Sequence, residues 1–564
     1  MGIPTYFRYL FQKDSSIVCS ETPDCDYLFF DLNSILYKVF YDDVQNNSDE
    51  NTFINNIIKE ILYLCNDVVK PKKLIYFALD GTAPRAKMVQ QRSRRYKSLQ
   101  LQKLFGKKDD WSPSNHICPG TLFMSKFCNS LLHTIFQKKK FACDEIILND
   151  YEVPGEGEHK ILPIVRKLQK DDTDANVIIM SPDNDLISLS ILTEKSKIYI
   201  MRFMDPPMAS MMKKEFNKND VMFIHLDKIM QKFLDTTSEN IDKNNVLIDY
   251  NFLLSMVGND FVVSVPYMKI KQGGMDKLIQ LYHEIFDQLG TYLIDKKTLD
   301  INVDFFKKII GELAKKESNE FLILGSFIQK EKSGNVFHGN TDDTISKEKQ
   351  FENNVQHLYM CNSNHPLFST YESHFKKVNF FSATYEWKSQ YYSYFCENKR
   401  YNQVEIRNKM IVEYLKSLKF TLLYYNKECP SWNWYYPFRV APLFSDVYYY
   451  ICSENSDINS ICKFSKGKPY SPFEQLMLIL PPESKWIVPE PYHELFEQYK
   501  SYFPTEFEVD ALQGLKYIYS EAILPEWDCF LQYMYDIRKK HKSLMYDDVQ
   551  RNKISTKIYR FINK

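Results

Sequence analysis

The chain has 564 residues, of which 44% are hydrophobic and 26% charged, and its 72 basic and 72 acidic side chains give a formal net charge of zero. This length exceeds that of one ordinary domain, so we expect two domains or one domain with large additions. The charge balance excludes a generally basic nucleic-acid binder, so any cationic site must be local.

Residue patterns exclude two further classes of protein. The twelve cysteines include no CxxC pair and no Cys/His cluster at zinc spacing, which argues against a structural zinc and a disulfide framework. No apolar run reaches the roughly 18 to 20 residues that a membrane span needs. We therefore expect a reduced, intracellular protein without membrane contact, in the cytoplasm or alternatively in the nucleus.

Apolar runs that end in an acidic residue recur in the first half of the chain. They are "YLFFDLN" at residues 27–33, "KLIYFALDG" at 73–81 and "ANVIIMSPDND" at 175–185, with helical stretches between them. This alternation predicts an α/β fold with a parallel sheet, in which the carboxyl ends of the strands share one ligand-binding edge. The acidic residues at these strand ends are Asp31, Asp80, Asp183 and Asp185.

A basic helix is predicted directly after the second of these runs, over residues 83–105, with Pro84 at its start. Residues 85–108 include many basic side chains and no acidic one. Such a helix suits a phosphate group, because arginine donates paired hydrogen bonds and lysine supplies a point charge. A solvated basic helix is the alternative. At about 100° per residue, one broad face carries Lys87, Gln91, Arg94, Arg95 and Ser98.

The motif "GEGEHK", residues 155–160, places two glutamates one residue apart where an extended segment enters a helix. A solvated loop, a helix cap and half of a metal site are the three interpretations. Because a cap explains only one glutamate, we favour Glu156 and Glu158 as metal ligands. Gly157 permits a close backbone path, and Pro154 stiffens the entry. Pro163 predicts a kink or an early end of the helix.

Asp260, in "VGNDF", completes a set of seven carboxylates. Each one alone has an ordinary explanation at a strand end or a helix N-cap. Gathered at one sheet edge, they would repel one another and raise each other's pKa values unless cations neutralised them. Hard oxygen ligands suit magnesium or manganese, and two such ions about 3.5 to 4 Å apart promote attack of water on a phosphodiester. The candidate ligands are Asp31, Asp80, Glu156, Glu158, Asp183, Asp185 and Asp260.

The composition changes in the second half of the chain. Residues 329–356 are polar and lack apolar periodicity, so they are predicted to be an exposed linker or insertion. Residues 380–525 are dense in tyrosine, tryptophan and proline, which predicts long loops packed by aromatic side chains. We therefore predict a first domain with the metal and phosphate sites at residues 1–275, a helical segment with the polar linker at 276–375, a second region that closes the site at 376–530, and a C-terminal tail at 531–564.

These motifs together resemble the eukaryotic 5′-to-3′ exoribonucleases of the Xrn/Rat family. "MGIPTYFRYL", "FALDGTAPRAKMVQQRSRRYK", "VPGEGEHK", "SPDNDLI" and "GNDF" occur in the family's order, and "SWNWYYPFRVAP" and "SPFEQLMLILPPES" resemble its second conserved region. The resemblance extends from Met1 to about Pro525. It implies a PIN/flap-nuclease-like sheet with flanking helices and a second, aromatic-rich and loop-rich α-helical region, in a compact catalytic-core version.

The resemblance also implies the reaction. The seven carboxylates would hold two magnesium ions, with manganese as an alternative, and a monomeric chain would processively hydrolyse single-stranded RNA that carries a 5′-monophosphate, releasing nucleoside 5′-monophosphates. The sequence does not identify any protein partner. Residues 2–7 would help to exclude duplex. The residues that match the 5′-phosphate pocket are Lys87, Gln91, Arg94 and Arg95, and those that would stack on the first base are Tyr37 and either Trp432 or Trp434.

The chain departs from the family pattern at several positions. Tyr37 replaces a histidine, Phe420 stands where tryptophan is usual, and "RVAP" replaces a histidine-tyrosine version. Tyrosine also stacks on bases, so Tyr37 keeps its predicted role. We expect these departures to affect substrate binding rather than metal binding.

Two other functions remain open from the sequence. A flap-endonuclease-like DNA nuclease would carry a glycine-rich helical hairpin after the last aspartate, but residues 261–279, "FVVSVPYMKIKQGGMDKLI", lack its GxGxxxA spacing. A catalytically inactive RNA-binding protein on the same fold would have no reason to keep all seven carboxylates and the phosphate-pocket residues. Both functions are therefore less favoured than the exoribonuclease.

Overall fold

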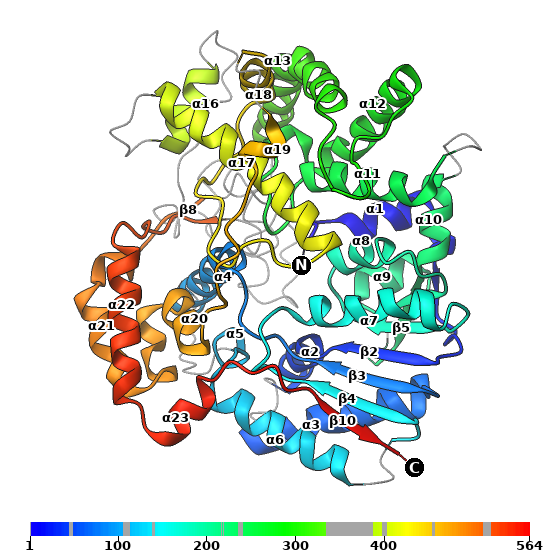
Figure 1. Cartoon of the computed structure of the whole chain (residues 1–564), viewed down its shortest axis with the longest axis vertical. Coiled ribbons are helices and arrows are strands. Elements are labelled where there is room, and N and C mark those ends of the chain that lie inside the picture. Colours follow the sequence, from blue (N-terminus) through cyan, green and yellow to red (C-terminus); the bar gives the residue numbers. More distant parts are fainter. Residues whose placement is uncertain are drawn as a thin grey trace.

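The computed structural model describes residues 2–43, 49–104, 113–137, 141–215, 217, 219–234, 241–333, 387–396, 403–453, 457–510 and 521–563. An eight-stranded sheet with helices on both faces forms the lower part of the molecule in Figure 1, and a helical region lies above it. Most of the polar stretch predicted as a linker, residues 329–356, lies outside the described residues. The predicted domain boundaries stay predictions.

The sheet has the strand order β1-β7-β6-β5-β2-β3-β4-β10. Its five central strands are parallel, which confirms the predicted α/β fold, whereas β1, β7 and β10 at the two edges are antiparallel. The strands are β1 (Val18–Cys19), β2 (Tyr27–Asp31), β3 (Leu74–Ala78), β4 (Glu145–Asn149), β5 (Val177–Met180), β6 (Ile198–Phe203), β7 (Val221–His225) and β10 (Tyr559–Ile562).

Alternating side chains of the central strands enter two separate apolar cores. Phe29 of β2 belongs to one core, while its neighbours Leu28 and Phe30 belong to the other. This explains why the strands are continuous apolar runs, since a parallel sheet is buried on both faces. The helices that accompany the sheet are α1 (Tyr6–Lys13), α2 (Asn33–Asp43), α3 (Glu50–Tyr63), α4 (Arg85–Leu104), α5 (Pro113–His116), α6 (Leu122–Phe136), α7 (Gly157–Asp171), α8 (Asp185–Ile191), α9 (Pro206–Met211), α10 (Leu226–Leu234) and α11 (Lys243–Met256).

The second region is helical and rich in buried aromatic side chains, as predicted. Among the described helices none is long and apolar enough to cross a membrane. A short ribbon pairs β8 (Val509–Asp510) with β9 (Glu521–Ala522). The helices α12 (Gly274–Leu289) and α13 (Val303–Ser333) precede this region. Within it lie α16 (Trp387–Cys396), α17 (Gln403–Asn426), α18 (Phe444–Ser453), α19 (Ile458–Ile461), α20 (Pro472–Ile479) and α21 (His493–Gln498), and α22 (Phe530–Lys540) and α23 (Tyr546–Arg551) follow.

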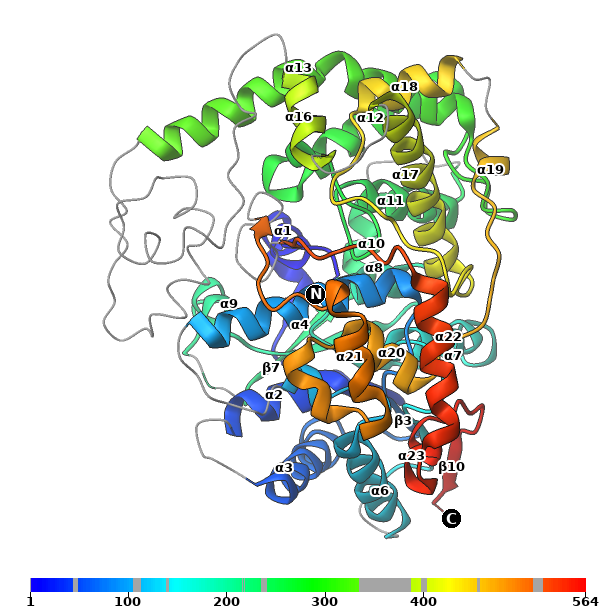
Figure 2. The ribbon, with the colours of Figure 1, turned by 90° about the vertical axis from the view of Figure 1, so that its left-hand side faces the viewer.

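The second region packs directly on α4, which crosses the middle of the molecule beside α20 in Figure 2. The amide of Ala83 donates to Gln475 Oε1 at 2.8 Å. Buried Arg92 donates to the carbonyl of Pro525 at 3.1 Å and also contacts the carbonyl of Tyr502. The helix with the predicted phosphate-binding face is thus held by residues from both halves of the chain.

Candidate functional site

The strand-end carboxylates gather at one edge of the sheet. Asp31 is the last residue of β2, and it pairs in register with Ala78, so Asp80 lies just beyond the neighbouring strand. Asp183 and Asp185 follow β5 in the same way. Oxygen atoms of Asp31, Asp80 and Glu158 lie within 4.8 Å of one another, which is close enough for a shared cation.

The "GEGEHK" motif brings two glutamates to this edge at the start of α7. Glu156 is the N-cap residue, but its side chain accepts no capping hydrogen bond, so the cap interpretation is wrong for this residue. A Cβ atom on Gly157 would lie 2.7 Å from Asp31 Oδ1, which explains the glycine between the glutamates. The helix continues through Pro163 to Asp171, so the early end suggested by the proline does not occur.

Neighbouring polar groups fix the orientation of these carboxylates. Ser181 Oγ donates to Asp31 at 2.9 Å. Asn33 Nδ2 donates to Asp80 at 2.9 Å, and the amide of Gly157 donates to the other oxygen of Asp80 at 2.7 Å. The tight start of α7 therefore serves both to place Glu156 and Glu158 and to hold Asp80.

Burial and mutual repulsion raise the pKa values of the clustered carboxylates. Burial, with the charges of Asp80 and Asp183, raises the pKa of Asp31 well above its usual value. Burial, with the charge of Glu156, raises the pKa of Asp80 to about 6. Burial, with the charges of Asp183 and Asp260, raises the pKa of Asp185 to about 7. Such a cluster favours a bound cation that lets all the carboxylates ionise together.

The residues fit divalent metal ions. All seven predicted ligands offer carboxylate oxygens, the donor type that magnesium and manganese prefer. Asp185 is 4% exposed, and its Oδ1 atom finds no hydrogen-bond donor among the described residues. Glu156, Glu158 and His159 form a second group whose donor atoms lie within 4.8 Å of one another.

Lys87 connects the basic helix to the acidic cluster. Its ammonium group contacts Glu156 and lies 2.8 Å from Asp260. Arg94 lies 3.7 Å from the same aspartate, and Gln90 donates a hydrogen bond to it. Burial alone would raise the pKa of Asp260, but the charges of Lys87 and Arg94 outweigh burial and hold this pKa well below its usual value.

The four predicted phosphate-pocket residues do not face one space. Arg94 lines a cavity of about 260 Å³, and its side chain is 25% exposed. Arg95 is buried and donates to Cys118 Sγ at 2.7 Å, while Gln91 accepts a hydrogen bond from Gln475 at 3.4 Å. The structure therefore brings Arg94 and Lys87 to the acidic cluster and packs Arg95 against the protein.

The same cavity is also lined by residues that were not among the predicted site residues. Among its described lining residues are Gln90, Lys97, Lys269, Tyr436 and Phe438. Lys97 belongs to the basic run of α4 and could have been included on that ground. Gln90 also lies in the basic motif, and Tyr436 and Phe438 lie in "SWNWYYPFRVAP", whereas Lys269 lies outside the motifs that resemble the family.

The three predicted base-stacking residues are not among the described residues that line this cavity. Tyr37 lies on α2 and packs against an apolar core of the sheet. Trp432 is 9% exposed. The indole of Trp434 donates to Glu413 at 2.7 Å, and its ring packs against Phe420 with centroids 4.7 Å apart.

Sequence profiles of one protein family match both halves of the chain. A profile described as "XRN 5'-3' exonuclease N-terminus" matches residues 1–203, and one described as "Xrn1 helical domain" matches residues 240–364 and 326–563. The first contains six of the seven candidate ligands, and the second contains Asp260 and the helical region. The two halves are thus similar to two parts of the same kind of protein.

Curated relatives carry matching names. The chain is 27% identical to 5′-3′ exoribonuclease 1 of Saccharomyces cerevisiae, covering 90% of the chain and 41% of the relative. It is 26% identical to the 5′-3′ exoribonuclease 2 homolog of Drosophila melanogaster, covering 93% of the chain and 69% of the relative. It is also 26% identical to 5′-3′ exoribonuclease 1 of Homo sapiens, covering 93% of the chain and 33% of the relative. The chain thus spans less than half of the yeast and human relatives.

Proposed function

The chain belongs to the Xrn family of 5′-3′ exonucleases, and on this basis we propose that it degrades RNA from the 5′ end. The proposed reaction is magnesium-dependent hydrolysis of single-stranded RNA that carries a 5′-monophosphate, with release of nucleoside 5′-monophosphates. The relatives are named 5′-3′ exoribonucleases, which supports this reaction. Processivity, a monomeric state and a cytoplasmic location, with the nucleus as the alternative, stay predictions.

One observation carries the proposal: carboxylates from separate strands meet at the sheet edge beside a basic helix. Asp31, Asp80 and Glu158 offer oxygen atoms within 4.8 Å of one another. Lys87 and Arg94 of α4 reach the same cluster through Asp260. A phosphodiester placed here would meet negative ligands for cations on one side and positive donors for its own charge on the other.

The carboxylates would hold the divalent cations. Bound magnesium or manganese would supply activation of water and neutralisation of phosphate charge at these oxygens. Serine and asparagine side chains hold Asp31 and Asp80 in place for this task, through Ser181 and Asn33. The proposed metal ligands are Asp31, Asp80, Glu156, Glu158, Asp183, Asp185 and Asp260.

The basic helix would select the 5′ end. Arg94 lines the cavity beside Asp260, so its guanidinium is placed to donate to a terminal phosphate. Lys87 lies between Glu156 and Asp260, where its ammonium can balance the charge of metal ligands and substrate together. We propose Arg94 as the principal phosphate contact, with Lys87 beside it.

Digestion of end-labelled RNA tests the proposal. Single-stranded RNA labelled at either end, with a 5′-monophosphate, 5′-triphosphate or 5′-hydroxyl, is incubated with magnesium or with EDTA. We expect mononucleotide release from the 5′ end only with the monophosphate and magnesium. Internal cuts, a preference for branched DNA, or binding without cleavage would contradict it. An Asp31→Asn variant serves as the control for contaminating nucleases.

A further inference from the structure

Tyr424 reaches the acidic cluster from the second half of the chain. It lies near the end of α17, which descends from the helical region toward α7 in Figure 1. The residue is 3% exposed, and its hydroxyl donates to Glu156 Oε1 at 2.8 Å across 268 residues of sequence. It is thus a contact between the second region and a proposed metal ligand.

The ring of Tyr424 touches two further segments of the site. Its centroid lies 3.8 Å from that of His159, the residue after Glu158. It lies 5.1 Å from that of Phe261, the residue after Asp260, in an edge-on arrangement at 83°. Tyr424 therefore contacts one proposed ligand, Glu156, and the residues that directly follow two others, Glu158 and Asp260.

Glu156 depends on such outside contacts for its orientation. As the N-cap of α7 it makes no side-chain hydrogen bond to the helix. Tyr424 binds one of its oxygens, and Lys87 contacts the other. Of these two contacts, that of Lys87 is shared with Asp260, whereas the hydroxyl of Tyr424 is directed at Glu156.

We propose that Tyr424 is a positioning residue, whose hydroxyl fixes the carboxylate of Glu156 for divalent-cation binding and whose ring fixes the segments of Glu158 and Asp260. This inference rests on the proposed metal-dependent function. Hydrogen-bond partners of metal ligands orient those ligands, and their loss typically lowers metal affinity or activity about 10- to 100-fold. The helical region would then complete the metal site rather than only cover it.

Tyr414 provides a matched control on the same helix. It is fully buried, like Tyr424, but its hydroxyl finds no hydrogen-bond partner among the described residues. Tyr414→Phe therefore removes a buried hydroxyl from α17 without touching the acidic cluster. Because the Tyr414 hydroxyl has no partner among the described residues, its removal breaks no hydrogen bond, so Tyr414→Phe controls only for the loss of a buried tyrosine hydroxyl from α17.

The experiment compares Tyr424→Phe, Tyr414→Phe and the unaltered full chain. Binding of Mn²⁺ is measured by calorimetric titration, together with the thermal midpoint and, for RNA with a 5′-monophosphate, kcat and KM as functions of magnesium concentration. For Tyr424→Phe we expect Mn²⁺ affinity or kcat to fall about 10- to 100-fold, with KM for RNA unchanged. Tyr414→Phe should match the unaltered chain.

The two readouts separate the inference from the proposed function. Equal Mn²⁺ affinity and equal kcat in all three proteins would overturn the positioning role, and so would a loss confined to thermal stability. If the unaltered chain bound Mn²⁺ without degrading RNA, the proposed function would fail, yet the affinity difference would still decide the role of Tyr424. A Tyr424→Leu variant, which also removes the ring, should weaken Mn²⁺ binding further than Tyr424→Phe.

Discussion

At Asp185, burial and the neighbouring carboxylates both disfavour ionisation of the side chain in the folded protein. The residue is 4% exposed, and one of its carboxylate oxygens has no hydrogen-bond donor among the described residues. Burial, with the charges of Asp183 and Asp260, raises its pKa from 3.8 to about 7. Without a bound cation, and at a pH between 3.8 and about 7, the carboxyl group of Asp185 is therefore protonated in the folded protein and ionised in the unfolded chain.

The sign of this linkage predicts how stability changes with pH. Between 3.8 and about 7, the folded state binds more protons than the unfolded state at this residue. Its contribution to the free energy of unfolding is therefore lost as the pH rises through this interval. In EDTA, we expect the thermal midpoint of the unaltered protein to fall more steeply with rising pH than that of Asp185→Asn.

Two additions make the measurement specific. Asp174→Asn, at a side chain that is 97% exposed, serves as the control and should leave the slope unchanged. Saturating magnesium should flatten the slope of the unaltered protein, since a cation stabilises the ionised carboxylates. Identical slopes for Asp185→Asn and the unaltered protein in EDTA would contradict the pKa shift.

Arg94 and Arg95 are adjacent but differ in surroundings, so their substitution should have different effects. Arg94 lines the cavity beside Asp260, whereas Arg95 is buried against Cys118. We expect Arg94→Ala to raise KM for 5′-monophosphorylated RNA about 10- to 100-fold, as expected for loss of a charged hydrogen bond, with little change in thermal stability. Arg95→Ala should instead lower the thermal midpoint.

Measurement of kcat and KM on RNA with 5′-monophosphate and with 5′-hydroxyl ends tests the prediction for Arg94→Ala, and the thermal midpoint tests that for Arg95→Ala. The effect of Arg94→Ala should be confined to the monophosphate substrate. Retained preference for the monophosphate in Arg94→Ala would place the phosphate contact elsewhere.

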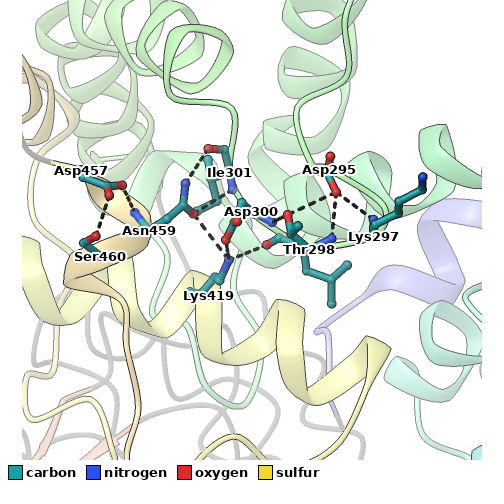
Figure 3. A network of polar contacts seen from close by, with 10 residues as sticks. Asp295, Lys297, Thr298, Asp300, Ile301, Lys419, Asp457, Asn459 and Ser460 are labelled. Atoms are coloured by element: carbon teal, nitrogen blue, oxygen red, sulfur yellow. Dashed lines mark hydrogen bonds and ion pairs between the residues drawn. The ribbon is translucent and has the colours of Figure 1, made fainter.

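At the scale of elements, α17 is held by polar contacts at Lys419 and, nearer its C-terminal end, at Tyr424. Near its middle, Lys419 donates to the carbonyl of Leu299 at 2.5 Å and lies 2.9 Å from Asp300. Asn459 of α19 also joins this network, which Figure 3 shows at the junction of three segments. The network holds the helix whose end carries Tyr424.

Loss of this network should loosen α17. Lys419 is 6% exposed in its side chain, so Lys419→Met would leave the carbonyl of Leu299 without its donor. We expect a loss of about 1 to 3 kcal/mol in the free energy of unfolding, measured by denaturant titration. Lys416→Met, which removes a pair with Glu413 within the same helix, should cost less than about 1 kcal/mol.

At the scale of the whole molecule, the sequence predicted what local patterns determine. Apolar runs followed by acidic residues identified the parallel strands and their shared edge, and the ordered motifs identified the family, which the profile matches confirm. That Tyr424 contacts Glu156 could not be predicted, because the two residues lie 268 positions apart and no motif marks the tyrosine. The antiparallel edge strand β10 escaped notice for a similar reason, since four residues carry little signal.

Helical periodicity also has a limit that α4 illustrates. A broad face of the helix contained Lys87, Gln91, Arg94 and Arg95, but the neighbours of that face differ along its length. Arg95 meets Cys118, while Arg94 meets the cavity. Spacing alone gives the direction of a side chain and not what packs against it. The sequence therefore could not show that Arg94 lines the cavity whereas Arg95 is buried.

The contacts across α4 make the two halves of the chain one structural unit. Gln475 binds the amide of Ala83, and buried Arg92 binds carbonyl groups of the second region.

A fragment of residues 2–275 would expose these groups and lose Tyr424 from the acidic cluster. We expect this fragment to bind Mn²⁺ at least tenfold more weakly than the full chain, about the lower limit for loss of a ligand's hydrogen-bond partner, and to degrade no RNA. The full chain should unfold in a single calorimetric transition. A fragment that folds, binds Mn²⁺ as the full chain does and degrades RNA would mean that the helical region is dispensable for the site.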